Sequence, residues 1–229
     1  PFAIGLDDAR TLLETADAGS GVFQVGHSRR FAPVYVRLRQ LLAEDTPHSA
    51  HIKMNRGELK NPPWTGDVEV TGGFLYETTI HFLDMLRFQF GEIAELVAFG
   101  SQHEYPEIDE FSVIFKFKSG FHCTFASSSD ASWHFPFERM EVFCHHRTIM
   151  TEETERLFDC RGSEPDFETH AFHMLDPDEK RGFVQEDAAF VTAILNGTEP
   201  AVTALDGFRA VELVESVYEV IRTGERIRF

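Results

Sequence analysis

The chain has 229 residues, 42% of them hydrophobic and 23 of them phenylalanine, which is enough apolar material for the core of one large domain. Its formal net charge of -17 at pH 7 argues against binding to nucleic acids and to anionic membranes. No apolar run reaches the roughly 18 residues of a membrane span. The N-terminus does not resemble a signal peptide, and the 3 cysteines show no CxxC spacing, so the sequence predicts a cytoplasmic protein with a small-molecule ligand.

The first part of the chain is expected to alternate between short helices and strands. Apolar residues at the helical period predict helices over 7–18 and 33–44, and short apolar or alternating runs predict strands over 22–25 and 51–56. The proline-rich stretch 57–70 is expected to be a loop. The glycines around the first strand precede it and do not form a GxGxxG turn, so no phosphate-binding site is expected there.

The stretch 71–91 is predicted to be one helix of about five turns, because two glycines open an apolar run that Gly91 ends. Its apolar side chains cover well over half of the circumference, which is typical of a mostly buried helix. Glu77, His81 and Asp84 follow one narrow stripe at i, i+4 and i+7. Buried ionisable groups are costly unless they are paired or face a cavity, so this stripe predicts a polar pocket with an acid/base pair. A salt-bridged structural histidine remains the alternative.

After this helix the apolar period changes to two, which indicates strands. Strands are expected over 93–102, 111–118, 121–127, 138–144, 148–151 and 155–158. Two helices, over 182–196 and 205–223, close the chain. The predicted fold class is α+β, with an open, mostly antiparallel sheet and helices packed on one of its faces.

The strand 111–118 places four apolar side chains on one face, namely Phe111, Val113, Phe115 and Phe117. Few helices are available to cover such faces, and exposed apolar patches usually mark interfaces. The sequence therefore predicts that the chain self-associates through the sheet, as a homodimer or homotetramer.

Three stretches together resemble the glucose-fructose oxidoreductase / inositol dehydrogenase family (Gfo/Idh/MocA). Residues 25–33 are similar to the family's VGxxRRFDP segment, and residues 72–84 are similar to its GGxxxDxGxHxxD helix. Asp206 and Gly207, with the following helix and Gly224, resemble its C-terminal segment. The resemblance covers essentially the whole chain in the family's order.

The resemblance implies a nucleotide-binding Rossmann domain followed by an α+β domain whose sheet supports oligomerisation and one wall of the substrate site. Pro1 resembles the proline of the family's Glu-Lys-Pro motif, whose lysine is catalytic. Residues 1–32 would then be the tail of a nucleotide-binding domain that this chain lacks, and residues 33–229 the substrate-binding and oligomerisation domain. The full-length parent would use NAD or NADP, whereas this chain would offer no cofactor-binding residue and would be inactive alone.

The resemblance also implies roles for individual residues. His81 matches the catalytic histidine, which accepts the proton of a substrate hydroxyl, and Glu77 matches an aspartate that binds the same hydroxyl. Glutamate at position 77 and Thr79 in place of a glycine depart from the family, and one extra methylene moves a carboxylate by roughly 1 Å. The expected substrate is a polyol, a sugar or a related alcohol. Further candidates for substrate binding are Arg30, Lys60, Trp64 and Asp84.

Two other functions stay open at this point. One is a metal-dependent hydrolase or lyase, since His145-His146 and the His170-x-x-His173 pair could join Glu77 and His81 as ligands of the zinc type. Adjacent histidines in a strand point to opposite faces, which argues against the first pair. The other is a non-catalytic oligomerisation or binding module, because a fold does not guarantee activity.

Overall fold

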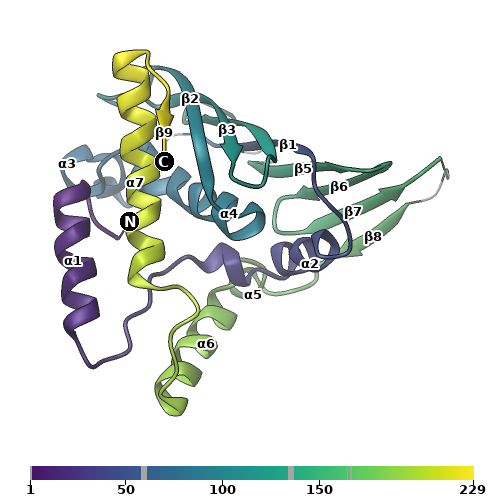
Figure 1. Ribbon diagram of the computed structural model, residues 1–229, viewed down its shortest axis with the longest axis horizontal. Coiled ribbons are helices and arrows are strands. Elements are labelled where there is room, and N and C mark those ends of the chain that lie inside the picture. The colour runs from purple at the N-terminus through teal and green to yellow at the C-terminus, as the bar shows by residue number, and fades with distance from the viewer. Residues whose placement is uncertain (1, 58–60, 134–136, 164, 166) are drawn as a thin grey trace.

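The computed structural model of the protein describes residues 2–57, 61–133, 137–163, 165 and 167–229 (Figure 1). Within these residues one sheet has the strand order β8-β7-β6-β5-β1-β4-β3-β2-β9. Only β1 and β4 pair in parallel; the other neighbours are antiparallel. The strands are β1 Ser49–Asn55, β2 Ile93–Ser101, β3 Glu110–Phe117, β4 His122–Ser128, β5 Glu138–Cys144, β6 Arg147–Glu152, β7 Arg156–Arg161, β8 Glu168–Ala171 and β9 Ile227–Arg228.

The helices gather on one side of this sheet, which confirms the α+β prediction (Figure 1). They are α1 Leu6–Ala18, α2 Pro33–Leu42, α3 Val68–Thr71, α4 Ile80–Phe90, α5 Pro177–Lys180, α6 Phe183–Asn196 and α7 Ala204–Thr223. The described residues also form two 3₁₀ turns, Ser28–Phe31 (η1) and Pro63–Gly66 (η2), and one π-helical turn, Leu75–Thr79 (η3). Helix α1 lies alongside α7, and α6 projects away from the sheet. No described helix has the length and apolar character needed to cross a bilayer.

The core lies between the sheet and helices α4 and α7. Strand β3 alternates between buried and exposed side chains, as its sequence predicts. The ring of Phe111 meets Tyr218 of α7 at 5.9 Å, and the ring of Phe117 meets Phe90 of α4 at 6.0 Å. Burial of a phenylalanine side chain contributes about 1.5–3 kcal/mol, so this layer is a major source of stability.

This packing corrects one sequence-based expectation. The face of β3 that carries Phe111, Val113, Phe115 and Phe117 is not left for a partner, because all four side chains are at most 3% exposed within the single chain. Helices α4 and α7 suffice to cover this face, because together they span strands β2 to β4. The open face of the sheet carries the alternate residues instead, among them Ile114.

Two local predictions also differ from the structure. The described residues 22–25 form no strand; the Val25 N–H donates to the Val202 carbonyl at 3.1 Å, which ties this segment to the start of α7 rather than to the sheet. The stretch 71–91 is helical through to Phe90 after its two opening glycines, Gly72 and Gly73, as predicted, but it is not a regular α-helix, because it begins with the π-helical turn η3. Both glycines have positive φ, 76° and 94°, a region that glycine adopts without strain.

Candidate functional site

A polar cavity of about 430 Å³ opens where α4, the ends of β1 and β5 and the start of α6 meet. It brings His81 and Glu77 to one wall, as the sequence predicts. Its ionisable lining residues are Arg29, Arg56, Glu77, His81, Glu138, Glu153, Glu155, Lys180 and Arg181. Two larger hollows, of about 600 and 640 Å³, lie over the open face of the sheet. The smaller cavity is the better candidate, because it combines an imidazole with converging donors and acceptors.

His81 lies in the first turn of α4 and is half-buried. Its Nδ1 atom is buried and has no hydrogen-bond partner among the described residues. Burial, then the neighbouring His27 and Arg29, hold the pKa of His81 well below its usual 6.5. The ring is therefore neutral at pH 7 and can accept a proton. Glu77 lies on the same wall but does not offset this shift, because the loss of solvent and the neighbouring His27 and Arg29 dominate.

Glu77 lies in the π-helical turn η3 that precedes α4. A π turn holds more residues per turn than an α-helix and is frequent at functional sites, and it shifts Glu77 off the stripe that regular α-helical spacing predicts. The Glu77 Oε2 atom accepts a hydrogen bond from the Thr78 hydroxyl at 2.6 Å. No hydrogen bond joins the two described side chains of Glu77 and His81, so they share a cavity wall without forming a direct pair.

Thr79, the other departure from the family pattern, points away from the cavity. It is fully buried, and its hydroxyl lies 2.7 Å from the Ser127 hydroxyl of β4. The Ser127 hydroxyl in turn donates to the Met54 carbonyl of β1 at 2.8 Å. The added side chain is thus satisfied by the sheet and anchors the π turn to it.

Arg30 and Asp84 do not line the cavity; they bind each other in the protein interior. The Arg30 Nε atom donates to Asp84 Oδ2 at 2.7 Å, and its Nη2 atom reaches both Asp84 Oδ1 and, at 3.0 Å, Asp206 Oδ1 of α7. The Asp84 side chain is completely buried. This bidentate pair ties η1 to α4 and α7, and any contact of either side chain with a substrate stays a prediction.

The other two predicted substrate-binding residues come from the segment before α3. Trp64 lies in η2, is 53% exposed and does not line the cavity. Lys60 falls outside the described residues. Their roles stay predictions.

Several charged residues of the cavity are additional to the predicted site residues. Arg29 of η1 binds the buried Glu138 of β5 at 3.0 Å, and Tyr35 donates to the same carboxylate. Burial, and then repulsion from Glu138, raises the pKa of Glu153 to about 7. The Arg56 guanidinium has a buried Nε atom with no hydrogen-bond partner in the described part of the chain, and burial lowers its pKa. These side chains come from strand ends and turns, and only the pairing of β1 with β5 brings them together.

The histidine pairs considered for a metal lie elsewhere. His145 and His146 occupy the turn between β5 and β6, not a strand, and their rings meet at 4.2 Å. His170 Nε2 contacts Glu168 Oε1 at 3.1 Å on the edge strand β8. In the part of the chain that the structure describes, no group of three or more His, Cys, Asp or Glu side chains could hold a metal ion.

Comparison with known families decides where this chain belongs. The family model of the GFO/IDH/MocA C-terminal domain matches residues 35–150, just over half of the chain. The chain belongs to this family. The matched region contains β1, the π turn, α4 and most of the sheet, so it includes the wall of the cavity that carries Glu77 and His81.

Relatives and solved structures agree with this assignment. The chain is 26% identical over 224 residues to a myo-inositol 2-dehydrogenase of Thermotoga maritima, covering 93% of this chain and 66% of that protein. It is 25% identical over 243 residues to an inositol 2-dehydrogenase of Rhizobium meliloti, covering 99% and 71%. The chain thus spans about two thirds of the length of these relatives. The structure of an Agrobacterium radiobacter oxidoreductase in complex with NAD+, L-tartaric acid and magnesium shares the fold, with a TM-score of 0.81, 18% identity and coverage of 100% and 71%.

Proposed function

We propose that this chain is the substrate-binding and oligomerisation part of an NAD(P)-dependent oxidoreductase that acts on a polyol, a sugar or a related alcohol. The observation that carries the proposal is the neutral His81 on the wall of a polar cavity, within a fold shared with oxidoreductases. Two of its relatives are named as inositol dehydrogenases. A cavity rich in carboxylates and guanidinium groups suits a ligand with many hydroxyls, each of which needs a donor or an acceptor.

His81 would remove the hydroxyl proton of the substrate. Oxidation of an alcohol needs this proton to leave as the hydride departs, and a neutral imidazole is suited to accept it near pH 7. The buried Nδ1 atom is unavailable to a ligand, so the accepting atom is Nε2. Glu77 lies on the same wall and would accept a hydrogen bond from a substrate hydroxyl, while Arg56 would donate to one from the opposite strand end.

The cofactor would be held outside this chain. A dinucleotide needs a glycine-rich turn between a parallel strand and a helix for its phosphates, and this sequence contains no GxGxxG pattern. The residues described here therefore do not fit the cofactor, whose part in the reaction would be to accept the hydride. The relatives are longer than the matched region, which leaves length for a separate nucleotide-binding domain, and residues 1–32 would be the tail of that domain.

The open face of the sheet would form the interface between subunits. It carries two large exposed apolar side chains, Phe99 at 73% and Ile114 at 54%, on the neighbouring strands β2 and β3. The broad hollows over this face are lined by residues from β1 to β5, which gives a second copy room to dock.

The test is an assay of the complete gene product with polyols and sugars, following nicotinamide reduction by absorbance. Oxidation of at least one such alcohol with NAD or NADP is expected, and the isolated 229-residue chain should be inactive. A folded gene product that oxidises none of them with either cofactor would contradict the proposal. Elemental analysis of the same sample distinguishes a metal-dependent hydrolase, which would contain stoichiometric metal.

A further inference from the structure

Behind His81, on the side away from the cavity, lies a second histidine that the proposed reaction leaves without a role. His27 precedes η1, is 2% exposed and does not line the cavity. Its ring packs edge-to-face against the ring of His81, with 5.7 Å between centroids and 86° between planes. Neither of its ring nitrogens has a hydrogen-bond partner among the described residues.

Such a residue is unusual for a purely structural position. An unsatisfied buried polar atom costs about 1–3 kcal/mol, and His27 has two of them. An apolar aromatic ring would fill the same space without that cost. A titratable ring kept at this place suggests that its nitrogens are used in some state of the protein.

Charged groups from four elements surround His27. Asp84 of α4 places Oδ1 at 3.9 Å from the Nε2 atom of His27. Arg30 of η1 and Asp206 of α7 belong to the same ion-pair network. Glu186 of α6 is also close; burial, and then Asp187, raises its pKa to about 7. His81 of α4 completes the set. Arg87 also reaches Asp206, at 3.6 Å, so Asp84 is the carboxylate beside which a protonated His27 would lie.

We propose that His27 and His81 act as a coupled imidazole pair, in which His27 is the positioning residue for the base. This inference rests on the proposed function. For Nε2 of His81 to accept a proton, the buried Nδ1 must already carry one. The ring of His27 packs edge-to-face on the ring of His81 and is the neighbouring titratable group. The substrate hydroxyl proton goes to Nε2 of His81. The charge that His81 then carries is felt by the adjacent ring of His27, whose own protonation beside Asp84 opposes it.

Burial disfavours the protonated form of both imidazole rings. It lowers the pKa of His27 as well as that of His81, with Asp84 opposing the shift at His27. Two adjacent imidazoles in one dry site cannot both be charged without strong repulsion, so each ring should sense the protonation state of the other.

The test follows the ring nitrogens of both histidines by NMR in the ¹⁵N-labelled 229-residue chain between pH 4 and 9. In the unaltered chain each ring should titrate in two steps, and His81 should hold its proton on Nδ1. His27→Phe keeps the ring shape and removes the titration, and it should raise the midpoint of His81 by about 1 pH unit and collapse it to one step. His51→Phe, an exposed ring on β1, is the matched control and should leave His81 unchanged.

An unchanged midpoint of His81 in His27→Phe, within about 0.2 pH unit, would overturn the proposal, since coupled groups shift each other by about 1 unit. If His27→Phe does not fold, the unaltered chain still decides the matter, because two independent single-step curves would overturn the pairing. Neither readout depends on turnover, so a gene product without dehydrogenase activity would contradict the proposed function and leave the coupling standing.

Discussion

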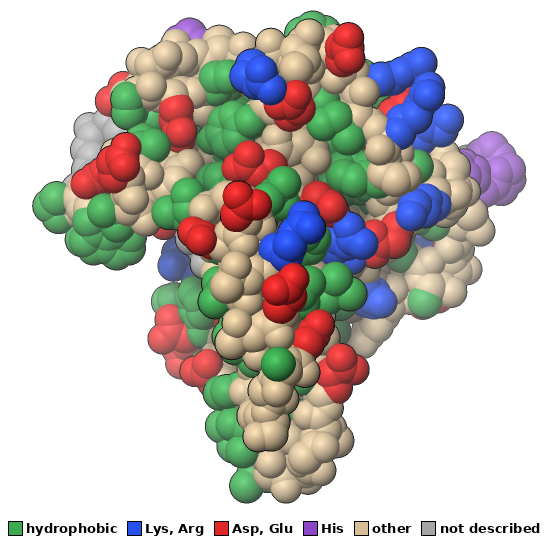
Figure 2. All heavy atoms as spheres, turned by 60° about the vertical axis from the view of Figure 1, so that its left-hand side comes forward, with side chains coloured by type: hydrophobic (Ala, Val, Ile, Leu, Met, Phe, Trp, Pro, Cys, Tyr) green, Lys and Arg blue, Asp and Glu red, His purple; other side chains and the backbone are tan. Residues whose placement is uncertain are grey.

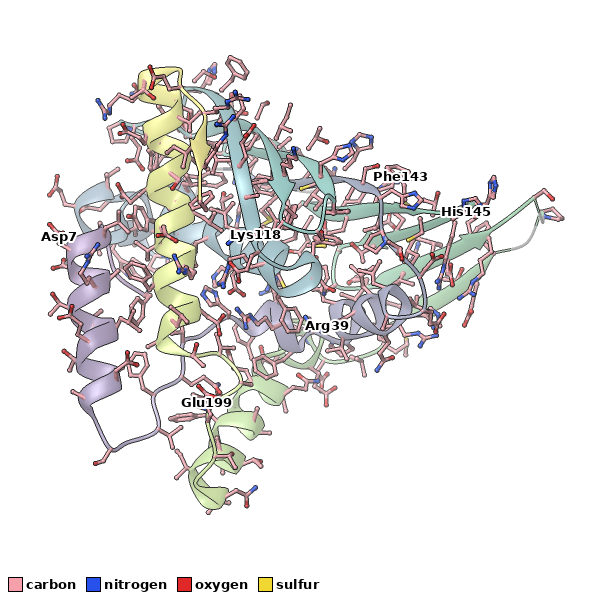
Figure 3. The ribbon with its side chains drawn as sticks, in the orientation of Figure 1. Asp7, Arg39, Lys118, Phe143, His145 and Glu199 are labelled. Carbon is pink, nitrogen blue, oxygen red and sulfur yellow. The ribbon has the colours of Figure 1, made fainter. Side chains whose placement is uncertain are left out.

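Arg30 and Asp84 lie 54 positions apart and form a bidentate pair in the interior, with side-chain exposures of 8% and 0%. The pair joins the segment that carries His27 to the helix that carries His81, and Asp206 extends it to α7. The ring of Phe88 stacks under the Arg30 guanidinium at 5.1 Å. Arg39 of α2, labelled in Figure 3, also stacks on that ring and reaches the Phe88 carbonyl. The position of the proposed base therefore depends on a buried ionic contact.

Asp84→Asn should lower the free energy of unfolding by about 3–5 kcal/mol, because it leaves the Arg30 charge buried without its main partner. Urea denaturation at pH 7 measures it. Replacing both residues, as Arg30→Met with Asp84→Leu, should cost less than the sum of the single changes. Arg222→Ala, which breaks an exposed pair with Glu219, should cost at most about 1 kcal/mol and serves as the control. Equal losses for Asp84→Asn and the control would contradict a structural role for the pair.

Gly182 caps α6 in a left-handed conformation, with φ 86°, directly against η1. A β-carbon there would lie 2.2 Å from the Ser28 carbonyl oxygen. Gly182→Ala should therefore destabilise by at least about 3 kcal/mol, from backbone strain and overlap together. Gly224→Ala has a similar φ of 72° but open space around its β-carbon, so only the strain of about 1–2 kcal/mol is expected. Thermal unfolding that ranks the two variants equally would contradict the close packing of α6 on η1.

Glu153 should make stability depend on pH. Burial raises its folded-state pKa from 4.5 to about 7, so folding favours the protonated acid. Its contribution is present below pH 4.5 and is lost as the pH rises towards 7. Relative to Glu153→Gln, the unaltered chain should lose up to about 2 kcal/mol over this interval, after discounting for its partial exposure. Exposed Glu14→Gln on α1 is the control. Stability curves that run parallel for the unaltered chain and Glu153→Gln would show that the carboxyl is not perturbed.

Charge placed on the open sheet face should dissociate the assembly. Phe99→Glu and Ile114→Glu each introduce a carboxylate into a surface that would be buried between subunits, so sedimentation equilibrium should show a shift to monomer. Helix α6 forms a projection, and the hydrophobic side chains along it (Figure 2) form a surface separate from this sheet face. Met174→Glu, 86% exposed before α5, is the control and should leave the association state unchanged. A monomeric unaltered chain at micromolar concentration would refute this interface.

How far the sequence could predict these features depended on the range of the contacts. The strand alternation follows from local spacing and was anticipated. A polar cavity at Glu77 and His81 was anticipated as well, although the π turn and the burial of Asp84 alter the predicted stripe. The pairing of Asp84 with Arg30 was not anticipated, because the two residues are distant in sequence and each of them alone resembles a ligand-binding group. Glu138 joins the cavity only through the register of β5 against β1, where it lies opposite Met54. The π turn was also hidden, because the apolar pattern of a π turn resembles that of an α-helix over so few residues.

The most direct measurement is single-turnover reduction of NAD or NADP by the complete gene product with its substrate. His81→Asn should lower this rate by roughly 10²–10⁴-fold across the neutral pH range, the usual contribution of a positioned base. Cofactor affinity should stay the same, because the cofactor would be held outside this chain. His122→Asn, an exposed histidine on β4, is the matched control and should react at the unaltered rate. If His81→Asn also reacts at the unaltered rate between about pH 6 and 8, His81 is a structural histidine and the proposed proton transfer is wrong.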